Sequence, residues 1–158
     1  MAYLIDGNNF LGRTISPVYR DPQHRYDLAR RLLIFQRVTR SRVILVFDGP
    51  PDPRLLEAEA PGGKFSVLFP PPGETADAVI KDLLASLKDL RRFFLVSSDR
   101  ELRAFARSRG ARVLTCAEFD GMLKEAVKAN RRSREMSKTT EKHSPLELDL
   151  WSEVFTKK

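Results

Sequence analysis

The stretch Ala2-Tyr3-Leu4-Ile5-Asp6-Gly7-Asn8-Asn9 decides the fold of this chain. Its first four residues form a continuous apolar run, which predicts a strand buried on both faces, as strands of parallel sheets are. The polar residues that follow lie at the carboxyl end of that strand. Open parallel sheets bind their ligands outside this end of the strands. The same eight residues therefore predict both the architecture and the place of a site.

Apolar runs of similar length recur along the chain and alternate with helical patterns. Further strands are predicted over 43–47, 65–69 and 93–96, with a weaker one over 112–114. Helices are predicted after the Asp21-Pro22 cap and over 75–90, 102–110 and 119–127, and the stretches 49–63 and 70–73 are predicted loops. Alternating strands and helices favour an α/β fold with a parallel sheet flanked by helices.

The length of 158 residues fits a single domain with a C-terminal tail. We assign residues 1–130 to the domain, because the strand and helix patterns end there. Residues 131–158 are predicted to be a basic flexible linker followed by a short amphipathic segment over 145–155.

Charge and cysteine content indicate the surroundings of the protein. The net charge of +7 and the pI near 9.9 are typical of proteins that bind polyanions, although many small proteins are basic for no specific reason. The single cysteine, Cys116, cannot form an internal disulfide, which favours a reducing compartment. No apolar stretch is long enough to span a membrane, and the N-terminus lacks a signal-peptide pattern. We therefore expect a cytoplasmic protein with no membrane partner.

Four aspartates fall at the carboxyl ends of predicted strands or just beyond them. They are Asp6 after the first strand, Asp48 after the second, Asp77 in the first turn of the helix after the third, and Asp99 after the fourth. Each alone has a structural alternative as a helix cap, a turn residue or a partner of a helix dipole. Four at one edge are harder to explain in that way, because carboxylates at close range repel one another unless a cation lies between them.

The residue types at this edge favour a hard divalent cation. Carboxylate oxygens suit Mg²⁺ or Mn²⁺, whereas two histidines and one cysteine are too few for a zinc site. The chain also lacks the glycine-rich loops that bind nucleotide phosphates. A metal held by carboxylates beside a basic surface suits hydrolysis of a phosphodiester, because the ion activates water and stabilises the displacement.

Other polar residues near the aspartates are candidates for supporting roles. Asn8 and Asn9 either orient Asp6 and a metal-bound water or serve as turn formers beside Gly7. The remaining candidates around the metal are Glu74, Ser97 and Ser98, each with helix capping or the helix dipole as its alternative; Glu101 is a further acid, and Lys81 is expected to pair with Asp77 at i, i+4 spacing.

Two clusters of arginines are predicted to contact phosphates, which confers affinity with little sequence choice. The alternative for both clusters is a solvated helix face. The candidate RNA-binding residues are Arg25, Arg30, Arg31 and Arg37 around the first long helix, and Arg100 and Arg103 after Asp99.

In four ordered motifs the sequence resembles the PIN-like nucleases, and within them the NYN group and its bacterial YacP-like branch. The motifs are Leu4-Ile5-Asp6-Gly7-Asn8-Asn9, Val46-Phe47-Asp48-Gly49, Glu74-Thr75-Ala76-Asp77 and Leu95-Val96-Ser97-Ser98-Asp99. The resemblance implies a Rossmann-like sheet, a divalent metal and endonucleolytic cleavage of RNA. It also implies that Asp6, Asp77 and Asp99 are core metal ligands and that Asp48 is an additional acid. Asn9 matches the asparagine of the family's Asp-Gly-x-Asn motif. Some YacP-like proteins act on ribosome-bound mRNA, which makes the ribosome a candidate partner.

The expected function is therefore hydrolysis of RNA by a metal-dependent endoribonuclease. The main alternative is a non-catalytic RNA- or ribosome-binding module on the same fold, against which the complete acid set argues. A flap-type DNA nuclease would need a larger chain, and a phosphotransferase using Asp6 as nucleophile would commonly have an aspartate at the position of Asn8.

Overall fold

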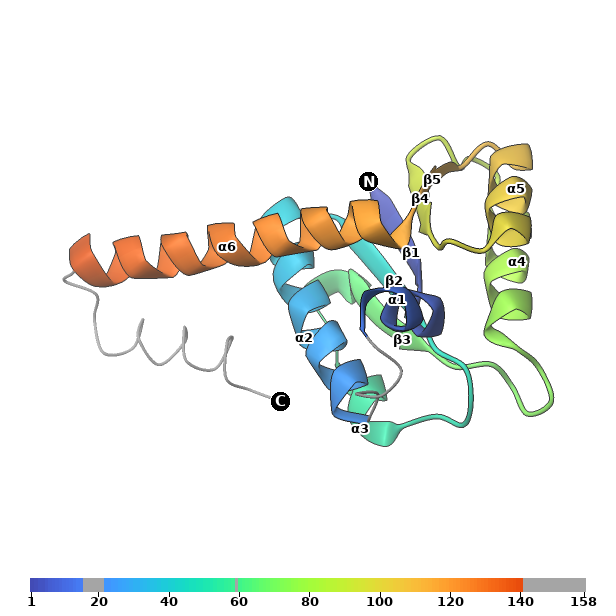
Figure 1. The fold of residues 1–158 in the computed structure, drawn as a ribbon, viewed down its shortest axis with the longest axis horizontal. Helices are drawn as coiled ribbons and strands as arrows, with labels where there is room; N and C mark the ends of the chain where they lie inside the picture. Colours follow the sequence, from blue (N-terminus) through green and yellow to red (C-terminus); the bar gives the residue numbers. More distant parts are fainter. Residues whose placement is uncertain (16–21, 59, 141–158) are drawn as a thin grey trace.

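A computed structural model describes residues 1–15, 22–58 and 60–140, and it contains a five-stranded parallel sheet with strand order β3-β2-β1-β4-β5 (Figure 1). The strands are β1 (Ala2–Asp6), β2 (Arg42–Val46), β3 (Phe65–Leu68), β4 (Phe93–Val96) and β5 (Arg112–Leu114). All four pairings between neighbouring strands are parallel. The α/β architecture predicted from the sequence, including the weak fifth strand, is confirmed.

Helices cover both faces of this sheet. The α-helices are α1 (Gly7–Thr14), α2 (Pro22–Thr39), α3 (Pro53–Leu56), α4 (Ala76–Ser86), α5 (Arg100–Ser108) and α6 (Cys116–Thr140), and η2 (Pro61–Gly63) is a 3₁₀ turn. One core contains the apolar residues of α1, α2 and α6, and a second contains those of α4 and α5. None of the helices in the described part of the chain combines the length and apolar character needed to cross a bilayer.

The alternation of side chains along β1 divides the two cores. Tyr3 and Ile5 point into the core beneath α1, α2 and α6, whereas Leu4 points into the core beneath α4 and α5. In the first core the ring of Tyr3 lies 5.1 Å from that of Phe35 and 5.6 Å from that of Phe119. The central strand is therefore fixed from both sides, and its last residue, Asp6, has a fixed position.

The strand order reverses between β1 and β4. The chain moves from β1 outward to β2 and β3, and then returns to place β4 on the other side of β1. At such a switch point the neighbouring connections leave on opposite faces, and open parallel sheets bind their ligands outside the carboxyl ends of the two strands. Asp6 and the segment from Ser97 to Asp99 lie at this point.

Several local predictions are wrong in detail. The helix predicted over 75–90 ends at Ser86, because Leu87 is extended (φ −89°, ψ 135°), although Leu90 still packs into the core. The predicted loop over 49–63 contains α3 and η2. Helix α1 begins at Gly7, directly after Asp6, with no intervening turn.

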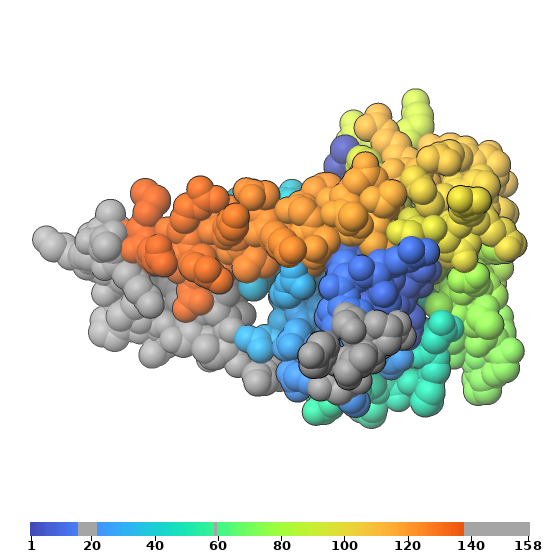
Figure 2. Space-filling model, viewed as in Figure 1, coloured from blue at the N-terminus to red at the C-terminus, as the bar shows by residue number. Residues whose placement is uncertain are grey.

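The largest difference concerns the predicted flexible linker. Residues 131–140 continue α6, which runs without a break from Cys116 to Thr140 and extends past the sheet and α2 (Figures 1 and 2). The linker prediction is wrong over these residues, because a helix that begins in the core continues through a polar sequence of good helix formers. The amphipathic segment predicted over 145–155 and the cap predicted at Asp21 lie outside the described residues.

Gly7 is required by a close approach of two chain segments. Its backbone has no positive φ, but a Cβ atom added there would lie 2.5 Å from Cε1 and 2.6 Å from Cδ1 of Phe47, and 3.0 Å from the carbonyl oxygen of Val46. The Phe47 ring is fully buried and has little room to move. The glycine therefore lets α1 begin against the end of β2, next to Asp48.

We predict that Gly7→Ala destabilises the fold by about 1–3 kcal/mol through overpacking, measured as the free energy of unfolding in urea. Gly121→Ala is the matched control, since Gly121 is exposed in the second turn of α6 and nothing lies within 4 Å of the added Cβ. That control should be neutral or stabilise by up to about 1 kcal/mol. Equal stability of the Gly7→Ala and wild-type proteins would contradict the close approach.

Candidate active site

The four predicted aspartates converge at the carboxyl edge of the sheet. Asp6 ends β1, Asp48 follows β2, Asp77 lies in the first turn of α4, and Asp99 is the N-cap of α5. The aspartates are close enough to repel one another. Repulsion from Asp77 and Asp48 raises the pKa of Asp6, and repulsion from Asp99 and Asp48 raises the pKa of Asp77. The structure therefore brings together groups that are up to 93 residues apart in the sequence.

Asp6 is the most perturbed of these carboxyl groups. Its side chain is only 5% exposed, and burial, followed by repulsion from Asp77, raises its pKa from 3.8 to about 6. A hydrogen bond of 3.2 Å from Ser97 Oγ to Asp6 Oδ2 opposes that shift. Burial and repulsion from Asp99 also raise the pKa of Asp77. At neutral pH this edge of the sheet therefore concentrates negative charge that water screens poorly.

A network of hydrogen bonds joins Asp6 to the segment after β4. Asp99 N donates to Ser97 Oγ over 3.1 Å, and Ser98 N donates to Asn9 Oδ1 over 2.8 Å. The Asp99 carboxylate caps α5 by accepting from Leu102 N over 3.0 Å. Asn9, Ser97 and Ser98 therefore hold the two acids in place, and the turn-former alternative for Asn9 does not apply.

A second set of bonds holds Asp48. Asn8 Oδ1 accepts from Asp48 N over 2.8 Å, and Asp48 Oδ1 accepts from Ala76 N over 2.7 Å. These two bonds connect the start of α1, the end of β2 and the start of α4. Asp48 thus has one carboxylate oxygen bound to the backbone of α4.

Lys81 forms a salt bridge with Glu101, so the prediction that it pairs with Asp77 is wrong. Lys81 Nζ lies 2.6 Å from Glu101 Oε1, which joins α4 to α5 on the rim of the site. The bond to Glu101, together with the charges of Asp77 and Asp99, raises the pKa of Lys81. The Glu101 carboxylate competes with Asp77 for the ammonium group of Lys81 because α4 and α5 pack side by side.

The donor chemistry of the site fits a divalent cation, although the side chains do not form a complete cage. Within residues 1–15, 22–58 and 60–140, no group of three or more His, Cys, Asp or Glu side chains is arranged to hold a metal ion. Mg²⁺ usually keeps several waters and takes only one or two protein carboxylates, so it does not need such a cage. Repulsion between carboxylates contributes to the raised pKa of Asp6 and of Asp77, and a cation bound between them would reduce this repulsion.

The predicted RNA-binding arginines have different surroundings. Arg25 lies beside the site: its guanidinium is 4.9 Å from the Phe47 ring centroid and donates to the Asp48 carbonyl oxygen over 3.4 Å. Arg31 instead pairs with Asp120 over 3.6 Å and ties α2 to α6. Arg103 has a buried Nε without a hydrogen-bond partner in the described residues. Arg30, Arg37 and Arg100 are exposed, as is the candidate acid Glu74.

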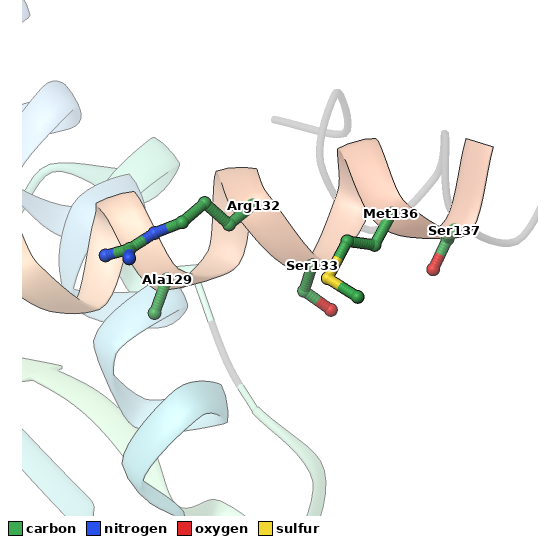
Figure 3. A pocket seen from close by; sticks show the side chains of 5 residues that line it. All are labelled: Ala129, Arg132, Ser133, Met136 and Ser137. Carbon is green, nitrogen blue, oxygen red and sulfur yellow. The ribbon is translucent and has the colours of Figure 1, made fainter. Parts of the chain in front are cut away.

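A hollow of about 530 Å³ lies elsewhere on the described surface, along the C-terminal part of α6 (Figure 3). Its lining residues are Ala129, Arg132, Ser133, Met136 and Ser137, all from that single helix. It contains none of the carboxylates, so it is separate from the candidate active site.

Two residues at the site were not predicted from the sequence to take part in it. Phe47 reads as an ordinary strand residue, yet its ring packs against Gly7 and Arg25. Cys116 starts α6, and its Sγ lies 3.2 Å from Asn9 Oδ1 although 107 residues separate the two. Only the fold places these side chains at the site.

The parallel sheet in this order has the PIN-like α/β fold. The family match to this fold is to a domain of nuclease type. Residues 3–158 match the model of the YacP-like NYN domain, and the chain belongs to that family.

Solved structures with the same fold include Rae1 (YacP) from Bacillus subtilis. That structure has 24% sequence identity and a TM-score of 0.70, with 99% of this chain and 91% of that chain covered. The structure of its W164L mutant has 24% identity and a TM-score of 0.66, with 85% of this chain and 82% of that chain covered. A comparison with curated proteins gives no match.

We predict that Asp6→Asn stabilises the metal-free protein at neutral pH. Because the pKa of Asp6 is raised on folding, its contribution to stability is lost as pH rises from about 4 to about 6. In EDTA, the mutant should exceed wild type by roughly 1–3 kcal/mol in unfolding free energy at pH 7, with little difference at pH 4.

Asp89→Asn is the control for that experiment. Asp89 lies at the opposite edge of the sheet, and its bonds to Arg91 hold its carboxyl pKa below the ordinary value, so its substitution should not stabilise the protein. If Asp6→Asn proved less stable than wild type at pH 7, the claim that burial and repulsion destabilise the charged form of Asp6 would be wrong.

Proposed function

We propose that this protein is a divalent-metal-dependent endoribonuclease that hydrolyses RNA with Mg²⁺ or Mn²⁺. The observation that carries the proposal is the buried carboxyl of Asp6, whose pKa burial and Asp77 raise to about 6, at the switch point of a nuclease-type fold. Strongly perturbed carboxyls with identified charge partners are typical of functional sites.

In this proposal Asp6, Asp77 and Asp99 would hold the ion, either directly or through its bound waters, with Asp48 as an additional acid. An ion bound by these residues would supply an activated water and would stabilise charge on the phosphate. Ser97 orients Asp6 through its hydroxyl, and Asn8 orients Asp48 through the backbone. Asn9 offers the N–H donors of its amide to a phosphate oxygen. Asp6, Asp48 and Asp99 are thus each held by a hydrogen bond with a neighbouring residue.

The distribution of positive charge supports RNA as the substrate. Arg25 lies at the site and can contact the phosphate next to the cleaved bond. Exposed basic side chains continue along α6 as Lys124, Lys128, Arg131 and Arg132. A helix that extends beyond the sheet can contact phosphates remote from the cleaved bond, which suits long RNA such as mRNA presented on the cytoplasmic ribosome (Figure 2).

We predict that Asp99→Asn lowers the rate of Mn²⁺-dependent RNA cleavage by at least about 100-fold while the melting temperature stays close to wild type. The fold should persist because asparagine also caps helices well and can still accept the bond from Leu102 N. The measurement is single-turnover cleavage of an end-labelled RNA.

Asp52→Asn is the matched control, because Asp52 caps α3 through Arg54 N and is not one of the four converging acids. This variant should cleave RNA at the wild-type rate. Wild-type cleavage by Asp99→Asn would refute the assignment of the metal site.

We predict that Arg25→Ala weakens RNA binding and reduces the salt dependence of log Kd by about one phosphate contact. Arg91→Ala removes the same charge at the opposite edge of the sheet, where the side chain is 86% exposed, and should bind RNA nearly as wild type does. Binding is measured by fluorescence anisotropy over a range of salt concentrations. Equal effects of the two substitutions would mean that only net charge matters.

The second candidate is a non-catalytic RNA- or ribosome-binding module. One observation favours it, namely that no three acidic, histidine or cysteine side chains of the described residues are arranged as a metal site. The two functions differ in their response to metal. The melting temperature of a nuclease that binds Mn²⁺ should rise with Mn²⁺ concentration, whereas that of a binding module without a metal site should not.

A further inference from the structure

The side-chain amide of Asn9 is held by donors from two distant parts of the chain. Its Oδ1 lies 2.8 Å from Ser98 N, 3.4 Å from Ser97 Oγ and 3.2 Å from Cys116 Sγ. Because a backbone N–H can only donate, the atom that faces Ser98 N must be the amide oxygen. The orientation of the Asn9 amide is therefore determined by its surroundings.

The hydroxyl of Ser97 can donate only one hydrogen bond, and it donates that bond to Asp6. Ser97 Oγ lies 3.2 Å from Asp6 Oδ2, which is nearer than its 3.4 Å to Asn9 Oδ1. A carboxylate is also a stronger acceptor than an amide oxygen. Since an amide oxygen has two lone pairs, Asn9 accepts from Ser98 N with one and from the thiol of Cys116 with the other.

Cys116 is well placed to be this donor. It is the first residue of α6, its side chain is 0% exposed, and its backbone N–H donates to Ser98 Oγ over 3.3 Å. Burial raises the pKa of the thiol, so it remains protonated at neutral pH. The start of α6 is thus bonded both to Asn9 and to the segment that carries Asp99.

We propose that Cys116 is a positioning residue of the nuclease site, an inference that rests on the proposed function. Its S–H bond holds the carbonyl of the Asn9 amide toward α6. The two N–H donors of the same amide therefore lie on the opposite side, where they can bind a phosphate oxygen of the RNA. Without the thiol, Asn9 keeps Ser98 N but loses the second donor that restrains its amide.

The test compares Cys116→Ala with Cys116→Ser in the full chain. The alanine variant should lose about tenfold in kcat for Mn²⁺-dependent RNA cleavage, with KM within about twofold of wild type. The serine variant should restore most of the kcat, because its hydroxyl can donate to Asn9. Leu123→Val is the control, since it loosens the core under the same helix without a hydrogen bond to Asn9, and it should lower the melting temperature without lowering kcat.

A second measurement does not depend on activity. The side-chain NH₂ resonances of Asn9, assigned through their loss in Asn9→Asp, should shift or broaden in Cys116→Ala and return toward wild type in Cys116→Ser. Wild-type resonances in the alanine variant would overturn the positioning role, as would a serine variant no better than alanine. If wild type itself cleaved no RNA, the proposed function would fail, and the resonances would still decide whether Cys116 positions Asn9.

Discussion

The structure depends on placing a carboxylate, Asp6, at the buried end of its central strand. Its side chain is 5% exposed, and the pKa of about 6 corresponds to a cost on the order of 3 kcal/mol for keeping it charged at neutral pH. That is a sizeable fraction of the stability of a typical domain. Two features of the fold surround this carboxylate. The hydroxyl of Ser97 donates a hydrogen bond to Asp6, and Gly7 allows helix α1 to begin directly after it.

The fold reduces the repulsion among the acids by directing helix N-termini at them. Helices α1, α4, α5 and α6 begin at Gly7, Ala76, Arg100 and Cys116, each within a few residues of the carboxyl edge of the sheet. The N-terminus of a helix carries a partial positive charge, so each start stabilises nearby carboxylates to a modest extent. This stabilisation falls off within one turn of each helix, and repulsion from Asp77 still raises the pKa of Asp6. In the proposed function, a bound cation would reduce that repulsion.

The sequence predicted the parts of the structure that follow simple periodic rules. The apolar runs located all five strands, and the rule that ligands bind at the carboxyl edge of a parallel sheet placed Asp6, Asp48, Asp77 and Asp99 together. The start of α1 at Gly7-Asn8-Asn9 was missed because these residues are poor helix formers, and tertiary packing against Phe47 decides the outcome.

Contacts between distant segments could not be predicted from the sequence. Lys81 pairs with Glu101 of the neighbouring helix α5 and not with Asp77 of its own helix α4. Cys116 lies within hydrogen-bond distance of Asn9, which is 107 positions away in the sequence. Neither contact leaves a local pattern, because both depend on how α4, α5 and α6 pack on the sheet. The metal ligands remain a prediction, since they follow from residue chemistry and from the family resemblance.

The most direct test of the account is calorimetric titration of Mn²⁺ into wild-type protein and Asp6→Asn at pH 6, repeated in buffers of different ionisation enthalpy. Because Asp6 titrates near this pH, we predict that Mn²⁺ binding to wild type releases about half a proton. Asp6→Asn should bind Mn²⁺ much more weakly and release no such proton. Equal Mn²⁺ affinity and equal proton release in the two proteins would contradict the claim that the buried carboxylate is the centre of a metal site.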